Sequence, residues 1–221
     1  MRKFDVIRAG IIPHELVAKE MLRLQQLRIT DDILDTLILV EHPEVVTIGP
    51  RARNEGVKAP QGYESTPIDR GGGLTWHGPG QLVAYPIFKW DLEGESNVAA
   101  IINLLERWII NSIRPIGINA YRDERMQGVW FENQKFSSIG LNFLKWVSRH
   151  GFTINYNTPT GRVENLASCG LETGTTTSLC AIGETGITRE SLEALLIGSA
   201  IPSINREIGT YSTFSILDES T

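Results

Sequence analysis

The chain has 221 residues, of which 41% are apolar and 21% charged, and its formal net charge is −5 at pH 7. This size and composition are typical of a globular domain with a sizeable core, so we expect a single domain over residues 1–221. The acidic balance argues against nonspecific nucleic-acid binding, and no apolar run approaches the roughly 18 residues of a membrane span. Because the N-terminus also lacks the apolar segment of a signal peptide, we expect a cytoplasmic protein.

The first half of the chain alternates between helical and strand patterns. Pro13 can open a helix in which Val17, Met21 and Leu24 form one stripe. Residues 51–67 are polar with Gly and Pro, which predicts a long loop. Ser96 is the expected N-cap of a helix that runs to about residue 113. The strands expected before that helix are residues 36–40, 45–48, 68–70 and 81–87.

The second half is expected to hold three strands, one loop and one helix. The predicted strands are residues 128–131, 135–143 and 150–157, the last with the alternation of a half-buried strand. Residues 158–178 form an expected loop, Thr188 can cap a final helix, and the tail after about residue 212 is expected to be weakly ordered. Irregular interspersion of strands and helices favours an α+β or mixed α/β fold over a doubly wound sheet.

Five glycines occur in the twelve residues from Arg70 to Gln81. Such a segment allows the backbone to approach a ligand closely and supplies N–H donors. Polar side chains, among them Thr75 and His77, lie between the glycines and could orient a substrate. The alternative is an elaborate hairpin without a ligand.

Cysteine and histidine usage limits the chemistry. With only Cys169 and Cys180, a disulfide framework is not expected. Cys169 stands beside glycine in a polar loop and is a candidate nucleophile, although most free cysteines are inert packing residues, as we expect of Cys180. His77 and His150 are possible bases for a Cys–His pair, or satisfied structural histidines. The four histidines show no metal-ligand spacing and no phosphate loop is present, so we expect neither metal nor cofactor.

Lys135 opens the segment Lys135-Phe136-Ser137-Ser138-Ile139-Gly140. A lone lysine at the start of a strand is most often a solvated surface residue. The small residues that follow leave space beside it, which is compatible with a site.

Together these segments resemble the lipoyl(octanoyl) transferase family. The family pattern R-G-G-x-x-T-[FYW]-H-G-P-G-Q-x-V-x-Y-P fits residues 70–86 at each specified place. The later patterns G-V-[WY], K-[IL]-x-[AS]-[IL]-G, H-G-[FL]-[AS]-[LI]-N-x-[NS] and P-C-G fit residues 128–130, 135–140, 150–157 and 168–170. The departures are Phe136, Thr153 and Ser168, and the similarity covers roughly residues 15–200.

The resemblance implies a fold and a reaction. The fold is that of biotin and lipoate protein ligases: a catalytic domain with a mixed sheet flanked by helices, plus a smaller sheet. The reaction moves octanoyl from octanoyl-acyl carrier protein to a lysine on lipoyl domains of 2-oxo acid dehydrogenase complexes and the glycine cleavage H protein. It needs no cofactor, and no nucleic acid or membrane takes part.

The resemblance also implies roles for individual residues. Cys169 is the acyl-thioester nucleophile, and Lys135 lowers its pKa and transfers a proton. Ser168 restores an N–H where the family has proline, which is expected to loosen the approach to Cys169. Thr153 is expected to narrow the acyl-binding surface. The implied substrate-binding residues are Arg70, Gly71, Gly72, Gly73, Leu74, Thr75, Trp76, His77, Ser138, Ile139, Gly140, Gly151, Phe152 and Thr153.

Two alternatives differ in what they predict. An ATP-dependent lipoate ligase on the same fold shares Gly71-Gly72-Gly73 but typically continues H-D-x-G-N, where this chain has His77-Gly78-Pro79-Gly80-Gln81. Such an enzyme requires ATP and no cysteine. A non-catalytic acyl-binding or lipoyl-domain-binding module predicts binding without turnover.

Overall fold

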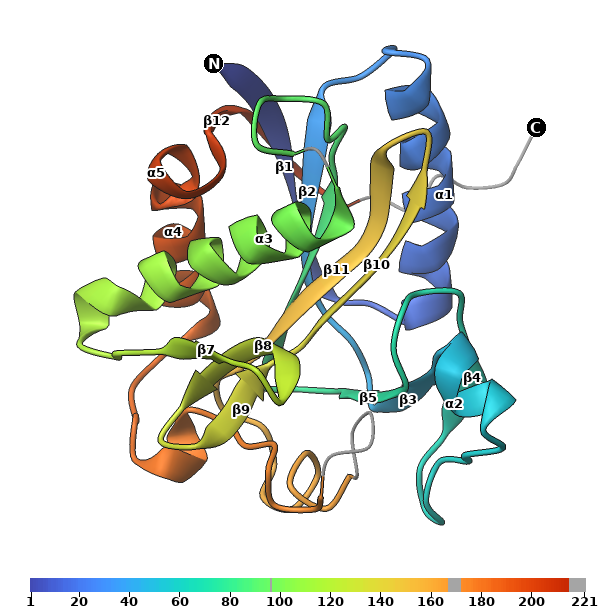
Figure 1. The fold of residues 1–221 in the computed structure, drawn as a ribbon, viewed down its shortest axis with the longest axis vertical. Coiled ribbons are helices and arrows are strands. Elements are labelled where there is room, and N and C mark those ends of the chain that lie inside the picture. Colours follow the sequence, from blue (N-terminus) through green and yellow to red (C-terminus); the bar gives the residue numbers. More distant parts are fainter. Residues whose placement is uncertain (96, 167–171, 215–221) are drawn as a thin grey trace.

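The computed structural model describes residues 1–95, 97–166 and 172–214, and a six-stranded sheet runs through its centre (Figure 1). In spatial order the strands are β10 (Ile139–Leu144), β11 (Val147–Asn155), β6 (Gln81–Ile87), β2 (Asp35–Glu41), β1 (Arg2–Ile11) and β12 (Arg206–Thr213). β1 is parallel to β2 and β12, whereas β2, β6, β11 and β10 pair antiparallel in turn, which makes the sheet mixed.

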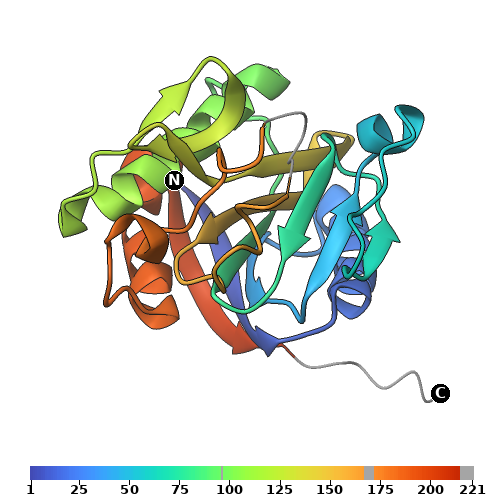
Figure 2. The same cartoon turned by 90° about the horizontal axis from the view of Figure 1, so that it is seen from below.

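Helices cover both faces of this sheet (Figure 2). One face carries α3 (Val98–Ile113), α4 (Arg189–Gly198) and α5 (Ala200–Ile204), and its core includes Trp108 and Phe152. The other face carries α1 (His14–Ile29), whose Met21 packs in a cluster with Val83. Because both faces of the sheet are covered, β2 and β6 are buried at every position, and their central residues are apolar.

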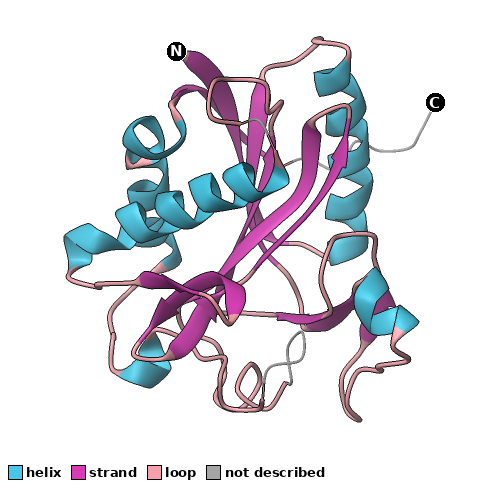
Figure 3. Cartoon of the chain, in the orientation of Figure 1, coloured by secondary structure: helices cyan, strands magenta, loops and turns pink. Residues whose placement is uncertain are grey.

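Two three-stranded sheets lie at one end of the central sheet (Figure 3). The first contains β4 (Ser65–Pro67), β3 (Val45–Ile48) and β5 (Leu74–His77), and the second contains β7 (Tyr121–Asp123), β8 (Met126–Phe131) and β9 (Gln134–Ser137). The remaining short elements are α2 (Pro50–Asn54), η1 (Arg114–Ile116) and η3 (Cys180–Ile182). The mixed sheet with smaller sheets confirms the predicted fold class.

Several helix boundaries agree with the sequence prediction. α1 begins directly after Pro13, and Thr188 caps α4 in a reciprocal arrangement with Ser191. The predicted cap of α3 is wrong by one residue, because Asn97 accepts a 2.9 Å hydrogen bond from the Ala100 N–H. Ser96 itself lies outside the described residues.

The loop predicted over residues 51–67 is wrong in part. Pro50 opens the short helix α2. Proline is suited to the first position of a helix because the N–H that it lacks would have no partner within the helix. The next strand is β4 at Ser65–Pro67, so residues 68–70 are not the predicted strand.

Two strand predictions also differ from the structure, and two strands were not predicted. The strand expected over residues 135–143 divides into β9 and β10, which belong to different sheets. β11 begins at Val147 and is buried at every position, not half-buried, because α1 packs against it and Trp108 of α3 packs on Phe152. β1 and β12 were not predicted, since charged and glycine residues interrupt their apolar pattern.

Over residues 1–95, 97–166 and 172–214, no helix combines the length and apolar character required to cross a bilayer.

Candidate active site

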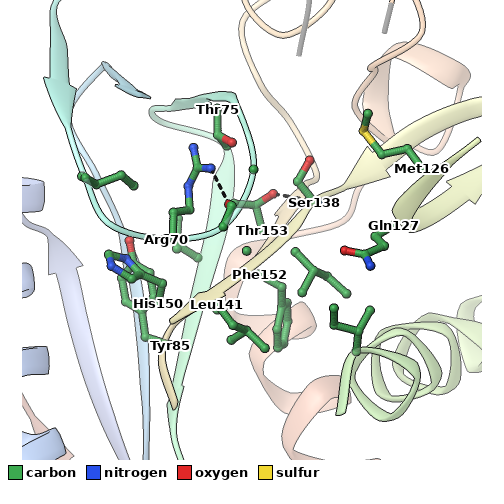
Figure 4. A pocket seen from close by; sticks show the side chains of 18 of the residues that line it. Arg70, Thr75, Tyr85, Met126, Gln127, Ser138, Leu141, His150, Phe152 and Thr153 are labelled. Carbon is green, nitrogen blue, oxygen red and sulfur yellow. Dashed lines mark hydrogen bonds between the residues drawn. The ribbon is translucent and has the colours of Figure 1, made fainter. Parts of the chain in front are cut away.

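A cavity of about 570 Å³ lies where the central sheet meets the two smaller sheets. Its wall includes side chains from the glycine-rich segment, β10 and β11, together with residues of α1 and α3 (Figure 4). Cavities of this size hold small-molecule ligands in other proteins. The structure therefore brings together segments that are far apart in the sequence.

Twelve of the predicted site residues line this cavity, and three of those that the structure describes do not. The residues that line it are Arg70, Gly71, Gly72, Thr75, His77, Lys135, Ser138, Ile139, Gly140, Gly151, Phe152 and Thr153. Gly73 does not line it, and Leu74 and Trp76 pack in a separate apolar cluster with Val46 and Leu166. Cys169 lies outside the described residues.

Lys135 is 3% exposed although it stands at the edge of a small sheet. Its N–H donates to Thr175 O at 2.8 Å, and its carbonyl accepts from Thr177 N at 2.9 Å. Gly128 makes room for the side chain, because a Cβ at that position would lie 2.6 Å from Lys135 Cε. The lysine is thus a buried wall residue, unlike the solvated surface lysine that is more common at such positions.

The described residues on both sides of Cys169 are fixed near this wall. Leu166 packs with Trp76, in the middle of the glycine-rich segment. On the other side, Thr176 forms a parallel bridge with Lys135. The chain on either side of the predicted nucleophile is therefore held against the glycine-rich segment and β9.

Arg70 is buried and fixes the glycine-rich segment. Its Nη2 donates to Thr47 Oγ1 at 2.8 Å, and Nη1 donates to Gly71 O at 3.0 Å. Gly71 N in turn donates to Leu141 O at 3.0 Å. Gly140 permits this approach, because a Cβ there would lie 2.8 Å from Arg70 Cδ and 2.9 Å from Gly71 O. The glycine at this position is needed for close contact between two backbones.

Ser138 and Thr153 face each other in the middle of the cavity wall (Figure 4). The Ser138 N–H donates to Thr153 Oγ1 at 3.3 Å, and Thr153 N donates to Ser138 O at 2.9 Å. The hydrogen bond from the Ser138 N–H orients the Thr153 side chain. The direction of the Thr153 methyl group is therefore set without a ligand.

All four histidines of the chain meet beside the cavity. The His14 ring lies 5.3 Å from that of His42, 6.0 Å from that of His77 and 6.4 Å from that of His150, measured between centroids. His14, His77 and His150 line the cavity with Tyr85, whereas His42 lies behind them. We call these four side chains the histidine cluster.

Hydrogen bonds orient three of these rings. His77 Nδ1 lies 2.7 Å from Gln81 Oε1, and His150 Nε2 donates to Asp69 Oδ1 at 2.8 Å. His42 Nδ1 donates to Ile12 O at 2.6 Å, which leaves Nε2 to accept from Tyr85 OH at 2.8 Å. A backbone φ of 62° at His150 interrupts the regular course of β11 at the point where its ring enters the cluster.

Burial keeps the cluster neutral at pH 7. Desolvation is the largest cause that lowers the pKa of His14, His42 and His150 to about 4. Desolvation also lowers the pKa of His77 well below its usual value, with further contributions from neighbouring histidines and Arg70. The cluster therefore presents neutral imidazoles to the cavity.

Sequence reasoning missed several cavity residues. His14, on α1, carries no local signal of a site, whereas Tyr85, on β6, stands at a specified place of the motif over residues 70–86 without being assigned to the site. The missed residues on the wall are His14, Arg51, Ile68, Val83, Tyr85, Val98, Ile102, Arg125, Met126, Gln127, Leu141, Phe143 and His150. For His150 the sequence offers two interpretations, a base or a structural histidine, and neither places it on a substrate wall.

The described residues contain no group of three or more histidine, cysteine or acidic side chains arranged to hold a metal ion.

Solved structures with the same fold include protein ligases. The bipartite lipoate protein ligase of Thermoplasma acidophilum superposes with a TM-score of 0.64 at 12% identity, covering 96% of this chain and 88% of the other. The biotin protein ligase of Aquifex aeolicus gives 0.54 at 12% identity, covering 93% and 69%. The fold is therefore that of the lipoate and biotin protein ligases.

Sequence comparison narrows the class. Residues 17–199 match the Lipoyl protein ligase A/B catalytic domain. An octanoyltransferase of Caldicellulosiruptor saccharolyticus is 36% identical over 185 residues, which are 80% of this chain and 78% of the relative. An octanoyltransferase of Salinispora arenicola is 33% identical over 214 residues, 93% and 94% of the two chains. The chain belongs to the lipoyl(octanoyl) transferase family of this catalytic domain and is an acyltransferase.

Proposed function

We propose that this chain transfers an octanoyl group from octanoyl-acyl carrier protein to one lysine of a lipoyl domain, through a thioester on Cys169. The acceptors are the lipoyl domains of 2-oxo acid dehydrogenase complexes and the glycine cleavage H protein. The observation that carries the proposal is the buried Lys135, which lines the cavity and pairs with the chain that follows Cys169.

The first step forms the enzyme thioester. The Cys169 thiolate attacks the carbonyl carbon of the donor, the bond to the carrier sulfur breaks, and the carrier leaves as a thiol after protonation. A free cysteine has a pKa near 8.5, so only a few per cent is thiolate at pH 7. The Lys135 ammonium favours the charged form of a nearby thiol.

The second step forms the amide. The lysine amine of the lipoyl domain attacks the Cys169 thioester, the carbon–sulfur bond breaks, and Cys169 is released. Lys135, which gives its proton to the departing carrier sulfur in the first step, accepts the proton that the attacking amine loses in the second. Backbone N–H groups of the glycine-rich segment are suited to stabilise the oxyanion in both steps. Because one thioester replaces another in the first step, no ATP is required.

The pocket wall is suited to an acyl chain. Leu141, Phe152 and Ile102 supply apolar surface from β10, β11 and α3. Each buried methylene contributes about 0.8 kcal/mol, so an eight-carbon chain gains several kcal/mol. Arg70, Thr75 and His77 lie on the same wall at the glycine-rich segment.

Intact-protein mass spectrometry tests this function. After incubation with octanoyl-acyl carrier protein and no ATP, we expect an octanoyl adduct that hydroxylamine removes. Cys180→Ser should retain the adduct, and Cys169→Ser should lose it. Octanoyl transfer to a lipoyl domain that requires ATP and proceeds in Cys169→Ser would instead support the lipoate ligase alternative.

A further inference from the structure

His14 differs from the other members of the histidine cluster in its hydrogen bonding. It is the first residue of α1 and is 5% exposed. Among the residues that the structure describes, none forms a hydrogen bond with its ring nitrogens, whereas His42, His77 and His150 each have at least one partner. A buried imidazole without a partner is unfavourable. Because His14 lines the cavity, water or a ligand in the cavity can satisfy it.

The cluster forms a buried end of the cavity. His14, His77, Tyr85 and His150 are each at most 5% exposed. Met126 and Gln127 lie on the opposite side of the cavity from His150 and Tyr85, and Gln127 is exposed to solvent (Figure 4). A chain that enters past Gln127 and extends inward therefore ends against the imidazoles.

The register of β10 and β11 gives the distance from the Ser138–Thr153 pair to the histidine cluster. Ser138 and Thr153 share hydrogen bonds near Lys135, and Leu141 pairs with His150 farther along the two strands. The three steps from Thr153 to His150 span about 10 Å at the usual rise of a strand. An extended chain advances about 1.2 Å per bond, so the seven bonds of an octanoyl group span about 8 Å. A chain with its carbonyl beside Thr153 thus places its last carbon next to the cluster.

We propose that His14 ends the acyl pocket and disfavours chains longer than octanoyl by holding water on its imidazole. A longer chain must displace that water with methylene groups, which leaves the ring nitrogen without a hydrogen bond. Selection at this end then depends on the polarity of His14 as well as on the space around it. The inference rests on the proposed octanoyl transfer.

The charges near His14 keep this end polar but neutral. Burial and the Arg70 guanidinium lower the His14 pKa to about 4, and Glu15 opposes this change. Asp69 and Arg149 act on His150 in opposite directions. A neutral imidazole still requires a hydrogen-bond partner, so the polarity of the pocket end persists at pH 7.

A chain-length profile tests the inference. Hexanoyl, octanoyl and decanoyl carrier protein serve as donors for a lipoyl domain without ATP, and kcat/KM is measured for each. In His14→Leu, which keeps similar bulk without polar atoms, we expect the decanoyl-to-octanoyl ratio to rise about tenfold, the gain from burying two more methylenes. His14→Gln retains a polar group, and Glu15→Gln changes an exposed neighbour. Both should keep the wild-type ratio.

The outcomes separate the explanations. An unchanged ratio in a folded His14→Leu overturns the inference. A ratio raised in Ile102→Ala but not in His14→Leu also overturns it, because the chain would then end against α3. If His14→Leu does not fold, His14→Ala provides the same test by enlarging the pocket end, and an unchanged ratio again overturns the inference. Absence of transfer from every donor in the wild type would refute the proposed function itself.

Discussion

Arg206 and Asp35 form a 2.8 Å salt bridge between β12 and β2, and both side chains are fully buried. The same guanidinium binds Glu95 at 2.5 Å and lies over the rings of Phe88 and Trp90. This network links β12, at the edge of the central sheet, to β2 in its middle. None of these residues lines the cavity, so the network has a structural role.

Arg206→Met is expected to lower the free energy of unfolding by about 3–5 kcal/mol, because it leaves the buried Glu95 carboxylate without its guanidinium and Asp35 with that of Arg28 alone. Urea unfolding measures the change. Arg23→Met removes an exposed ion pair with Glu20 and should cost less than about 1 kcal/mol. Similar decreases in the free energy of unfolding of the two variants would contradict this explanation.

Lys135→Ala is expected to raise the pKa of the Cys169 thiol, because the ammonium that favours its thiolate is removed. The rate of alkylation is measured against pH in a Cys180→Ser background, so that only one thiol reacts. Lys145→Ala, on the exposed turn between β10 and β11, is the matched control and should leave the midpoint in place. An unchanged midpoint in Lys135→Ala would remove Lys135 from the proposed role.

The histidine cluster is expected to make folding stability depend on pH. The unfolded chain binds protons at histidines below about pH 6.5, whereas folded His14, His42 and His150 stay neutral until about pH 4. The contribution of these histidines to the free energy of unfolding is therefore largest above pH 6.5 and decreases as the pH is lowered toward 4.

Each histidine contributes a slope of at most about 1.4 kcal/mol per pH unit. Urea unfolding at pH 7.0, 5.5 and 4.5 measures the total slope. His14→Gln should reduce it by the share of one histidine. A stability that stays constant from pH 7.0 to 4.5 would show that these histidines are protonated equally in both states.

Gly80→Ala is expected to destabilise the fold by about 2 kcal/mol or more. Gly80 has a φ of +82°, and an added Cβ would overlap Asn157 O. Gly198, at the end of α4, has nothing within 4 Å of an added Cβ, so Gly198→Ala should stabilise by about 0.5–1 kcal/mol. Thermal and urea unfolding of the two variants give the comparison. Equal effects would contradict the steric explanation.

The sequence predicted those elements whose signals are local. Pro13 marked the start of α1, Thr188 marked the cap of α4, and the apolar run of β2 was recognised as buried. The glycine-rich motif identified the segment that lines the cavity, because a long motif specifies backbone conformation residue by residue. The family and the fold class followed from the same residues.

Only the tertiary structure decided which side chains share the cavity. It buried Lys135 beside Gly128 and separated Trp76 from the wall that its neighbours line. It also placed His14 between the rings of His77 and His150. These contacts join residues on different elements, and their distances are set by strand pairing and helix packing, which no local pattern in the chain encodes.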